Sequence, residues 1–172
     1  MWRRVLVGLV IVLVGATGFA FVLLPGIVDR RMNTVIATTH LAITDSARVL
    51  HESLLVADMH ADQLLWSRDL LARADHGHVD LARLASGNVA LQVFSAVTKT
   101  PRDMNYDHNT GDTDNITLLA AVQRWPLASW TSLRARALHQ ADRLHAAARR
   151  SGGALVVVTD QQALRTFLER RA

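Results

Sequence analysis

The chain has 172 residues, of which 50% are hydrophobic and 20% are charged. This composition excludes collagen-like, fibrous and disordered proteins, and the absence of cysteine excludes disulfides and cysteine-ligated metal sites. The net charge of +4 comes almost entirely from arginines that are scattered among acidic residues, so no nucleic acid is expected as a partner.

The N-terminus carries a membrane segment. Residues 1–4 are basic, and the 24 residues Val5–Val28 contain no charge, which is long enough to span a bilayer. A cleaved signal peptide is the alternative, with Val5–Gly15 as its apolar region and a cut after residues 16–18. Because the apolar run continues through Phe19–Leu24, an uncleaved single-pass anchor is favoured. Arginine pairs flank both ends, and the N-terminal amine favours a cytoplasmic N-terminus with an exported body.

The first part of the body shows one helix, then a strand–helix–strand pattern. Residues 29–50 are expected to form a leading helix or stalk, with helical spacing over Thr34–Leu50. A short apolar run at Leu54–Asp58 predicts a buried strand, and Val79–Ser86 predicts a helix that Gly87 ends. Val89–Val97 reads as a strand buried on both faces of a parallel sheet.

The second part continues the alternation. Thr98–Thr113 is polar and predicts a loop, and helices are expected over Ile116–Trp125 and Pro126–Ala148. A strand is expected over Ala154–Val158, followed by a helix that Asp160 caps. Strands that alternate with helices indicate an α/β protein with a parallel sheet.

The strongest candidate metal ligands follow the first strand. His60 and Asp62 lie two residues apart, so an extended chain presents both side chains on one side, at the strand end where α/β barrels place their chemistry. An imidazole with a carboxylate suits Zn²⁺. Asp58 lies two residues before His60 and so projects to the same side of the strand, where it could contact the metal ligands without binding the metal itself. The alternative is a loop in which Asp62 caps a helix over Leu64–Leu71 and His60 is polar surface.

Two other groups of polar residues are weaker candidates. The histidines of Asp75–Asp80 have ligand spacing, but they lie in a turn without a buried strand, where Asp80 is expected to cap a helix. Ser95 follows the second strand, and no base lies near it in the sequence.

Three blocks of sequence resemble the start of the membrane (renal) dipeptidase family of zinc peptidases. They are Asp58–Asp62, Gly77–Leu84 and Gly87–Ser95, and their order and spacing match the family. The chain departs from the commonest form of the first block at Met59 and Ala61, where Gly and Asn are usual. Neither is a ligand position, so the departure bears on substrate preference.

The resemblance covers the chain from about residue 50 onward, and it implies a (β/α)₈ barrel with two zinc ions that hydrolyses dipeptides. In the family, the residues that correspond to His60 and Asp62 bind one zinc ion. Such a barrel needs about 250 residues, so residues 51–172 are expected to form an incomplete barrel domain that lacks the bridging glutamate and the later histidines.

The expected function is therefore that of a membrane-anchored zinc dipeptidase, present as an N-terminal fragment that is inactive alone. No catalytic residue is assigned within the chain. A non-catalytic membrane-anchored binding module and a degenerate enzyme are the alternatives, and a homo-oligomer stays open.

Overall fold

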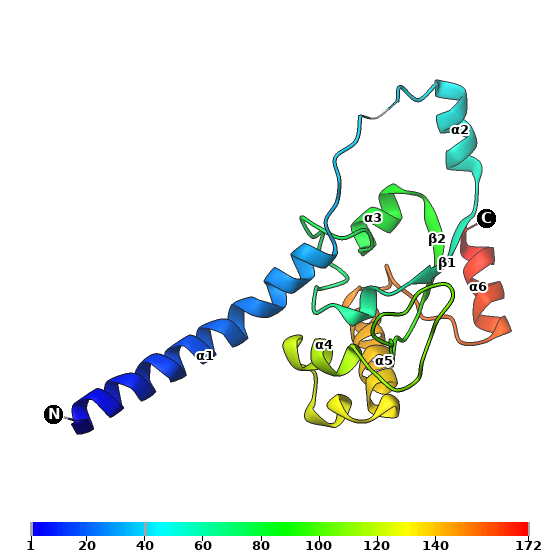
Figure 1. Ribbon diagram of the computed structural model, residues 1–172. Helices are drawn as coiled ribbons and strands as arrows, with labels where there is room; N and C mark the ends of the chain where they lie inside the picture. The colour runs from blue at the N-terminus through cyan, green and yellow to red at the C-terminus, as the bar shows by residue number, and fades with distance from the viewer. Residues whose placement is uncertain (1, 40, 172) are drawn as a thin grey trace.

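The structure, a computed structural model, describes residues 2–39 and 41–171. It consists of one long helix that projects from a small mixed body (Figure 1). The elements, in chain order, are α1 (Trp2–Met32), α2 (Asp45–Ser53), β1 (Val56–Ala61), the 3-10 helix η1 (Gln63–Leu65), α3 (Leu81–Ser86), β2 (Val89–Phe94), α4 (Ile116–Val122), the 3-10 helix η2 (Leu127–Trp130), α5 (Leu133–Arg150) and α6 (Gln161–Arg171).

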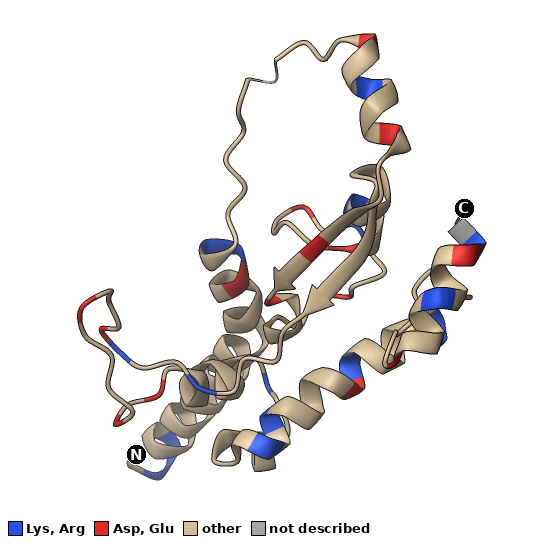
Figure 2. Ribbon diagram, turned by 90° about the vertical axis from the view of Figure 1, so that its right-hand side faces the viewer, with Lys and Arg blue, Asp and Glu red and all other residues tan. Residues whose placement is uncertain are grey.

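Helix α1 is long and apolar enough to cross a membrane. Figure 2 shows that α1 carries no charged residue between the basic residues at its start and the charged residues near its end. Its residues 2–24 are exposed, whereas Pro25 and Asp29 are buried against the body. The helix therefore has a free apolar part and a C-terminal part that belongs to the body.

The centre of the body is a parallel β–α–β unit. Strands β1 and β2 pair in parallel, and α3 connects them. Asp80 caps α3 by accepting a 2.8 Å hydrogen bond from the amide of Arg83, and Gly87 follows its last residue. The predicted helix and the parallel pairing of the two strands are confirmed. The burial predicted for the first strand was wrong, because only Ala61 of β1 is buried and the other residues are half-buried or exposed. The sheet has two strands among the described residues, and β2 is only half-buried because no third strand lies beside it.

The hydrophobic core lies beside this sheet. Its buried members are Leu65, Trp66, Ile116, Ala120 and Trp125, and the half-buried Val28, Val97, Leu119 and Trp130 pack against them. The core thus joins the end of α1 to η1 and α4. Burial of these large apolar side chains is the main favourable term that holds these segments together.

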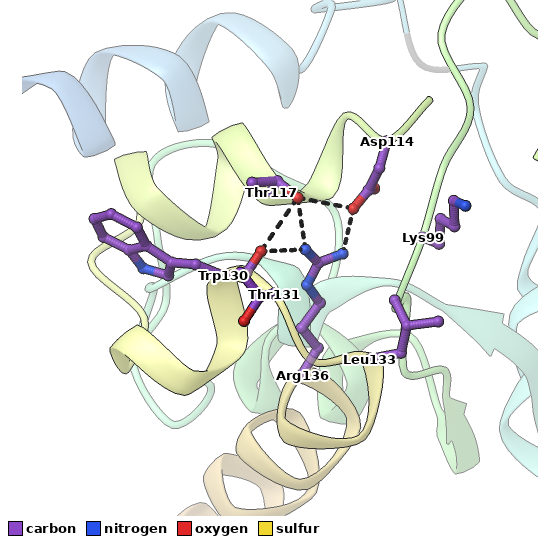
Figure 3. A pocket seen from close by; sticks show the side chains of 7 residues that line it. All are labelled: Lys99, Asp114, Thr117, Trp130, Thr131, Leu133 and Arg136. Atoms are coloured by element: carbon purple, nitrogen blue, oxygen red, sulfur yellow. Dashed lines mark hydrogen bonds and ion pairs between the residues drawn. The ribbon is translucent and has the colours of Figure 1, made fainter. Parts of the chain in front are cut away.

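A buried arginine organises the second half of the body (Figure 3). Arg136 of α5 is 1% exposed. Its guanidinium donates to five acceptors: the backbone oxygens of Thr98 (2.6 Å), Ser129 (2.6 Å) and Trp130 (2.8 Å), the Thr117 hydroxyl (2.7 Å) and the Asp114 carboxylate (2.6 Å). Burial acts to raise the pKa of Asp114, but the hydrogen bonds from Arg136 and from neighbouring groups outweigh it and lower that pKa to about 2.

The end of α1 is held by a second polar cluster. The buried Asp29 carboxylate lies 3.0 Å from Nε of Arg68 and 3.3 Å from Nε2 of His76. The amide of Gly77 donates a 2.8 Å hydrogen bond to the Asn33 carbonyl. Gly77 has a φ of +76°, and a Cβ there would lie 1.7 Å from the Arg68 guanidinium. Glycine therefore suits this turn, because a side chain there would be strained at this φ and would displace the Arg68 guanidinium.

The leading helix is shorter than predicted. Of Thr34–Leu50, only the part from Asp45 onward is helical, and α2 then extends to Ser53; residue 40 lies outside the described residues. Thr44 caps this helix by accepting a 3.2 Å hydrogen bond from Ala47. The preceding β-branched residues have a low helix propensity, and no packing surface compensates for it.

Two predictions for the C-terminal part were wrong. The helix predicted over Pro126–Ala148 is divided into η2 and α5, because Ser132 caps α5 through a 3.2 Å hydrogen bond from Ala135. Residues 154–158 form no strand, since the backbone at Ala154 and Leu155 bonds back to Ser151 instead of to a neighbouring strand. The loop over 98–113 and the capping of α6 by Asp160 are confirmed.

The Arg136 network predicts a large loss of stability for a substitution that keeps the charge. Arg136→Lys should lower the free energy of unfolding by at least about 2 kcal/mol, because an ammonium cannot replace the five directed hydrogen bonds and bonds to charged groups contribute roughly 1.5–3 kcal/mol each. Denaturant unfolding in detergent, followed by tryptophan fluorescence, measures the change. The exposed Arg134→Lys on the same helix is the control, expected within about 0.5 kcal/mol of the parent. Equal losses in both variants would contradict the role of the network.

Candidate functional site

The polar side chains at the C-terminal ends of β1 and β2 form one cluster. The imidazole Nε2 of His60 lies 3.2 Å from Oδ1 of Asp62, as the two-residue spacing predicts. Ser95, the residue after β2, donates a 2.7 Å hydrogen bond from Oγ to Asp62, and its Oγ also lies 3.2 Å from Nε2 of His60. Three polar groups from two parallel strands therefore converge on one point.

The strand pairing sets this convergence. Ala61 lies opposite Phe94 in the parallel register, and the amide of Ser95 donates a 3.0 Å hydrogen bond to the Ala61 carbonyl. Ser95 is thereby fixed between His60 and Asp62. The cluster is open to solvent, since the side chains of His60 and Asp62 are 71% and 45% exposed.

Asp58 contributes to the backbone of the site. Its Oδ1 accepts a 3.1 Å hydrogen bond from the amide of His60, not from the imidazole ring. Asp58 therefore steadies the strand segment that carries His60, which is an indirect way to place a ligand.

The three residues do not form a nucleophilic triad. In a Ser–His–Asp triad the acid and the serine contact opposite nitrogens of the imidazole. Here Ser95 and Asp62 both contact Nε2 of His60, and the Ser95 hydroxyl is donated to the carboxylate. The arrangement is a hydrogen-bonded cluster in which an imidazole, a carboxylate and a hydroxyl lie close together.

The donor set and its spacing suit zinc. Neutral imidazole and carboxylate are zinc ligands with bonds of about 2.0–2.2 Å, so two ligands on one edge of a tetrahedron lie about 3.3 Å apart. The 3.2 Å between Nε2 of His60 and Oδ1 of Asp62 matches this edge. Residues 2–39 and 41–171 contain no group of three or more His, Cys, Asp or Glu that could hold a metal ion. Zinc sites usually have three or four protein ligands, so the pair alone falls short of a complete zinc site.

The competing segment Asp75–Asp80 has a structural role. Asp80 caps α3, as predicted, whereas His76 is largely buried between Asp29 of α1 and Asp75, 2.6 Å away. Hydrogen bonds from Arg30 and then His76 lower the pKa of Asp75 to about 2. The segment therefore attaches the body to α1.

A shallow pocket of about 420 Å³ lies beside Arg136 and is lined in part by Lys99, Asp114 and Thr117 (Figure 3). Lys99 donates to the Gly111 carbonyl, and Arg136 directs its guanidinium at acceptors of the protein itself. These cations serve the fold and present no ready anion site.

The sequence placed Ser95 at the end of the second strand but did not predict its contacts with His60 and Asp62. His60 is 35 positions away and reaches Ser95 only through the strand pairing. The available signal was that the carboxyl ends of neighbouring parallel strands meet at one edge of a sheet.

Comparisons with protein-family models, with curated proteins and with solved structures found no match.

The geometry predicts that Ser95 restrains the imidazole of His60. Ser95→Ala removes the hydroxyl that joins Asp62 to His60, so the imidazole should move more on the picosecond-to-nanosecond scale. Carbon-13 relaxation of the His60 ring in the metal-free chain measures this. Ser95→Thr keeps the hydroxyl and should retain the restraint, and Ser86→Ala at an exposed helix end is the control. An unchanged order parameter in Ser95→Ala would show that the hydroxyl does not position His60.

Proposed function

We propose that this chain is part of a membrane-anchored zinc dipeptidase and supplies its first metal ligands, His60 and Asp62. The single observation that supports this most is their convergence, 3.2 Å apart, at the C-terminal end of a parallel strand. The three blocks that resemble the membrane dipeptidase family place the same two residues at its first metal-binding motif.

The proposed architecture is the N-terminal part of a (β/α)₈ barrel. The β1–α3–β2 unit supports it, because such a barrel repeats parallel strands joined by helices and places its site at their C-terminal ends. The outer edges of β1 and β2, which pair with no other strand among the described residues, are where further strands would add.

The proposed cofactor is zinc, with two ions in the complete site. Zinc at such a site polarises the carbonyl of the scissile peptide bond and makes a bound water acidic enough to attack it. His60 and Asp62 would hold one ion, Ser95 would orient the Asp62 carboxylate, and Asp58 would steady the backbone amide of His60. The resemblance implies that the remaining ligands are a bridging glutamate and histidines on later strands of the barrel.

The proposed location is a membrane, with α1 as a single-pass anchor and the body on the exported side. The uncharged, exposed residues of α1 support the anchor. The orientation rests on the flanking charges and the N-terminal amine.

The proposal predicts zinc binding that depends on both ligands. His60→Ala and Asp62→Asn should each weaken binding by more than about tenfold, since even changes in residues that support metal ligands cost 10–100-fold. Zinc competition against a chromophoric chelator, with the full chain in detergent, measures the affinity. His108→Ala, in an exposed loop, is the matched control and should bind as the parent does. If the parent and all three variants bind zinc equally, the metal site lies elsewhere.

Activity is a separate prediction. In membranes from cells that express the natural gene with its flanking DNA, zinc-dependent hydrolysis of dipeptides should fall to background in His60→Ala and remain in His108→Ala. Hydrolysis is followed by amino-acid release, with tripeptides as the substrate control. Zinc binding without any hydrolysis in the parent would instead favour the non-catalytic binding module or the degenerate enzyme.

A further inference from the structure

The packing of α1 against the body fixes where the helix leaves the bilayer. Pro25 is buried, and its carbonyl accepts a 3.3 Å hydrogen bond from Nε2 of Gln123, which is itself 4% exposed. Val28 packs against the hydrophobic core. The apolar residues that remain free are Val5–Leu24, which span about 30 Å at 1.5 Å per residue and so match the hydrocarbon thickness. The body therefore begins at the membrane surface, without a spacer.

The chain segment that follows Gln123 begins close to this exit point, because Gln123 contacts Pro25. Figure 1 shows α4 and the yellow segment after it on the side of the body that faces back toward the N-terminal part of α1. We call residues 124–128 the exit loop. Its Arg124, Pro126, Leu127 and Ala128 are exposed, and Leu127 is 75% exposed.

The exit loop is held in place. The amide of Trp125 donates a 2.9 Å hydrogen bond to Ala120, its indole is buried in the core, and its carbonyl accepts a 3.2 Å hydrogen bond from the Trp130 indole. Arg124 adopts a φ of 58°, which turns the chain sharply at the end of α4. The turn therefore holds Leu127 in an exposed position, although burying its side chain would lower the free energy of the folded chain.

We propose that the exit loop is a second membrane contact, in which Leu127 enters the boundary between headgroups and acyl chains and Arg124 binds lipid phosphates. The inference rests on the anchor proposed above and is independent of the dipeptidase activity. Continuity with α1 identifies the bilayer as the occupant, because Gln123 contacts the helix at the position where it emerges. An apolar side chain beside an arginine suits the lipid interface, because the apolar group can enter the acyl chains while the guanidinium stays with the phosphates.

This contact would fix the orientation of the body. A single helix lets a body rotate and tilt above the membrane, whereas a second point of contact beside the helix restricts both motions. The cluster at the ends of β1 and β2 would then stand in a constant position relative to the lipid surface.

The absence of cysteine allows a direct test. Leu127→Cys in the full chain is labelled with an environment-sensitive fluorophore and reconstituted into phosphatidylcholine–phosphatidylserine vesicles, with or without lipids that carry a quencher at the top of the acyl chain. The reference is Val14→Cys in the free part of α1, where Val14 is 65% exposed. The control is Leu50→Cys on α2, where Leu50 is 61% exposed and remote from the N-terminal part of α1 (Figure 1).

We expect the label in Leu127→Cys to emit at shorter wavelength than the label in Leu50→Cys and to be quenched by the lipids, as the label in Val14→Cys is. Adding Arg124→Gln to Leu127→Cys should reduce this quenching in vesicles that contain phosphatidylserine.

Quenching in Val14→Cys but not in Leu127→Cys would overturn the second contact and leave the anchor intact. A shift to shorter wavelength without quenching in Leu127→Cys would also overturn the contact, and would indicate a protein neighbour such as a second copy of the chain. No quenching in Val14→Cys would overturn the anchor and this inference together.

Discussion

The buried guanidinium of Arg136 is the interaction on which the second half of the body depends. It gathers acceptors from the loop after β2, from Asp114 and Thr117 at the start of α4, and from η2. A charge at 1% exposure is tolerable only when it is fully hydrogen-bonded, so these segments must take up their native arrangement together. The core around Trp66 and Trp125 packs beside this network, since Ile116 and Trp130 come from the same segments.

The candidate site depends on a different constraint, the parallel pairing of β1 with β2. A parallel pair requires a crossover connection, which α3 supplies, and it brings two carboxyl ends to one edge. His60 and Asp62 share a side because of their spacing within one strand, and Ser95 joins them because the register places it opposite Ala61. The segment that follows Asp62 packs through Leu65 and Trp66 against Trp125 of the exit loop, so one hydrophobic core supports both the site and the proposed membrane contact.

Local patterns in the sequence were sufficient for much of the fold. The apolar run of α1, the capping of α3 by Asp80 and the capping of α6 by Asp160 are decided by neighbouring residues, and they were predicted. The predictions failed where local signals competed. Ser132 caps a new helix and so divides what the apolar spacing predicted as one continuous helix. Ser151 accepts hydrogen bonds from the backbone of Ala154 and Leu155, which were predicted to pair in a sheet.

The sequence by itself determined an apolar helix that can cross a membrane, a strand–helix–strand unit, and the pairing of His60 with Asp62, because each depends on spacings of a few residues. Only the tertiary structure decided that Ser95 reaches His60, that Arg136 is buried, and that His76 attaches the body to Asp29. These contacts join residues that are far apart in the chain, or depend on how many acceptors surround one side chain. No local pattern encodes them, since they exist only once the strands have paired and α1 has packed against the body.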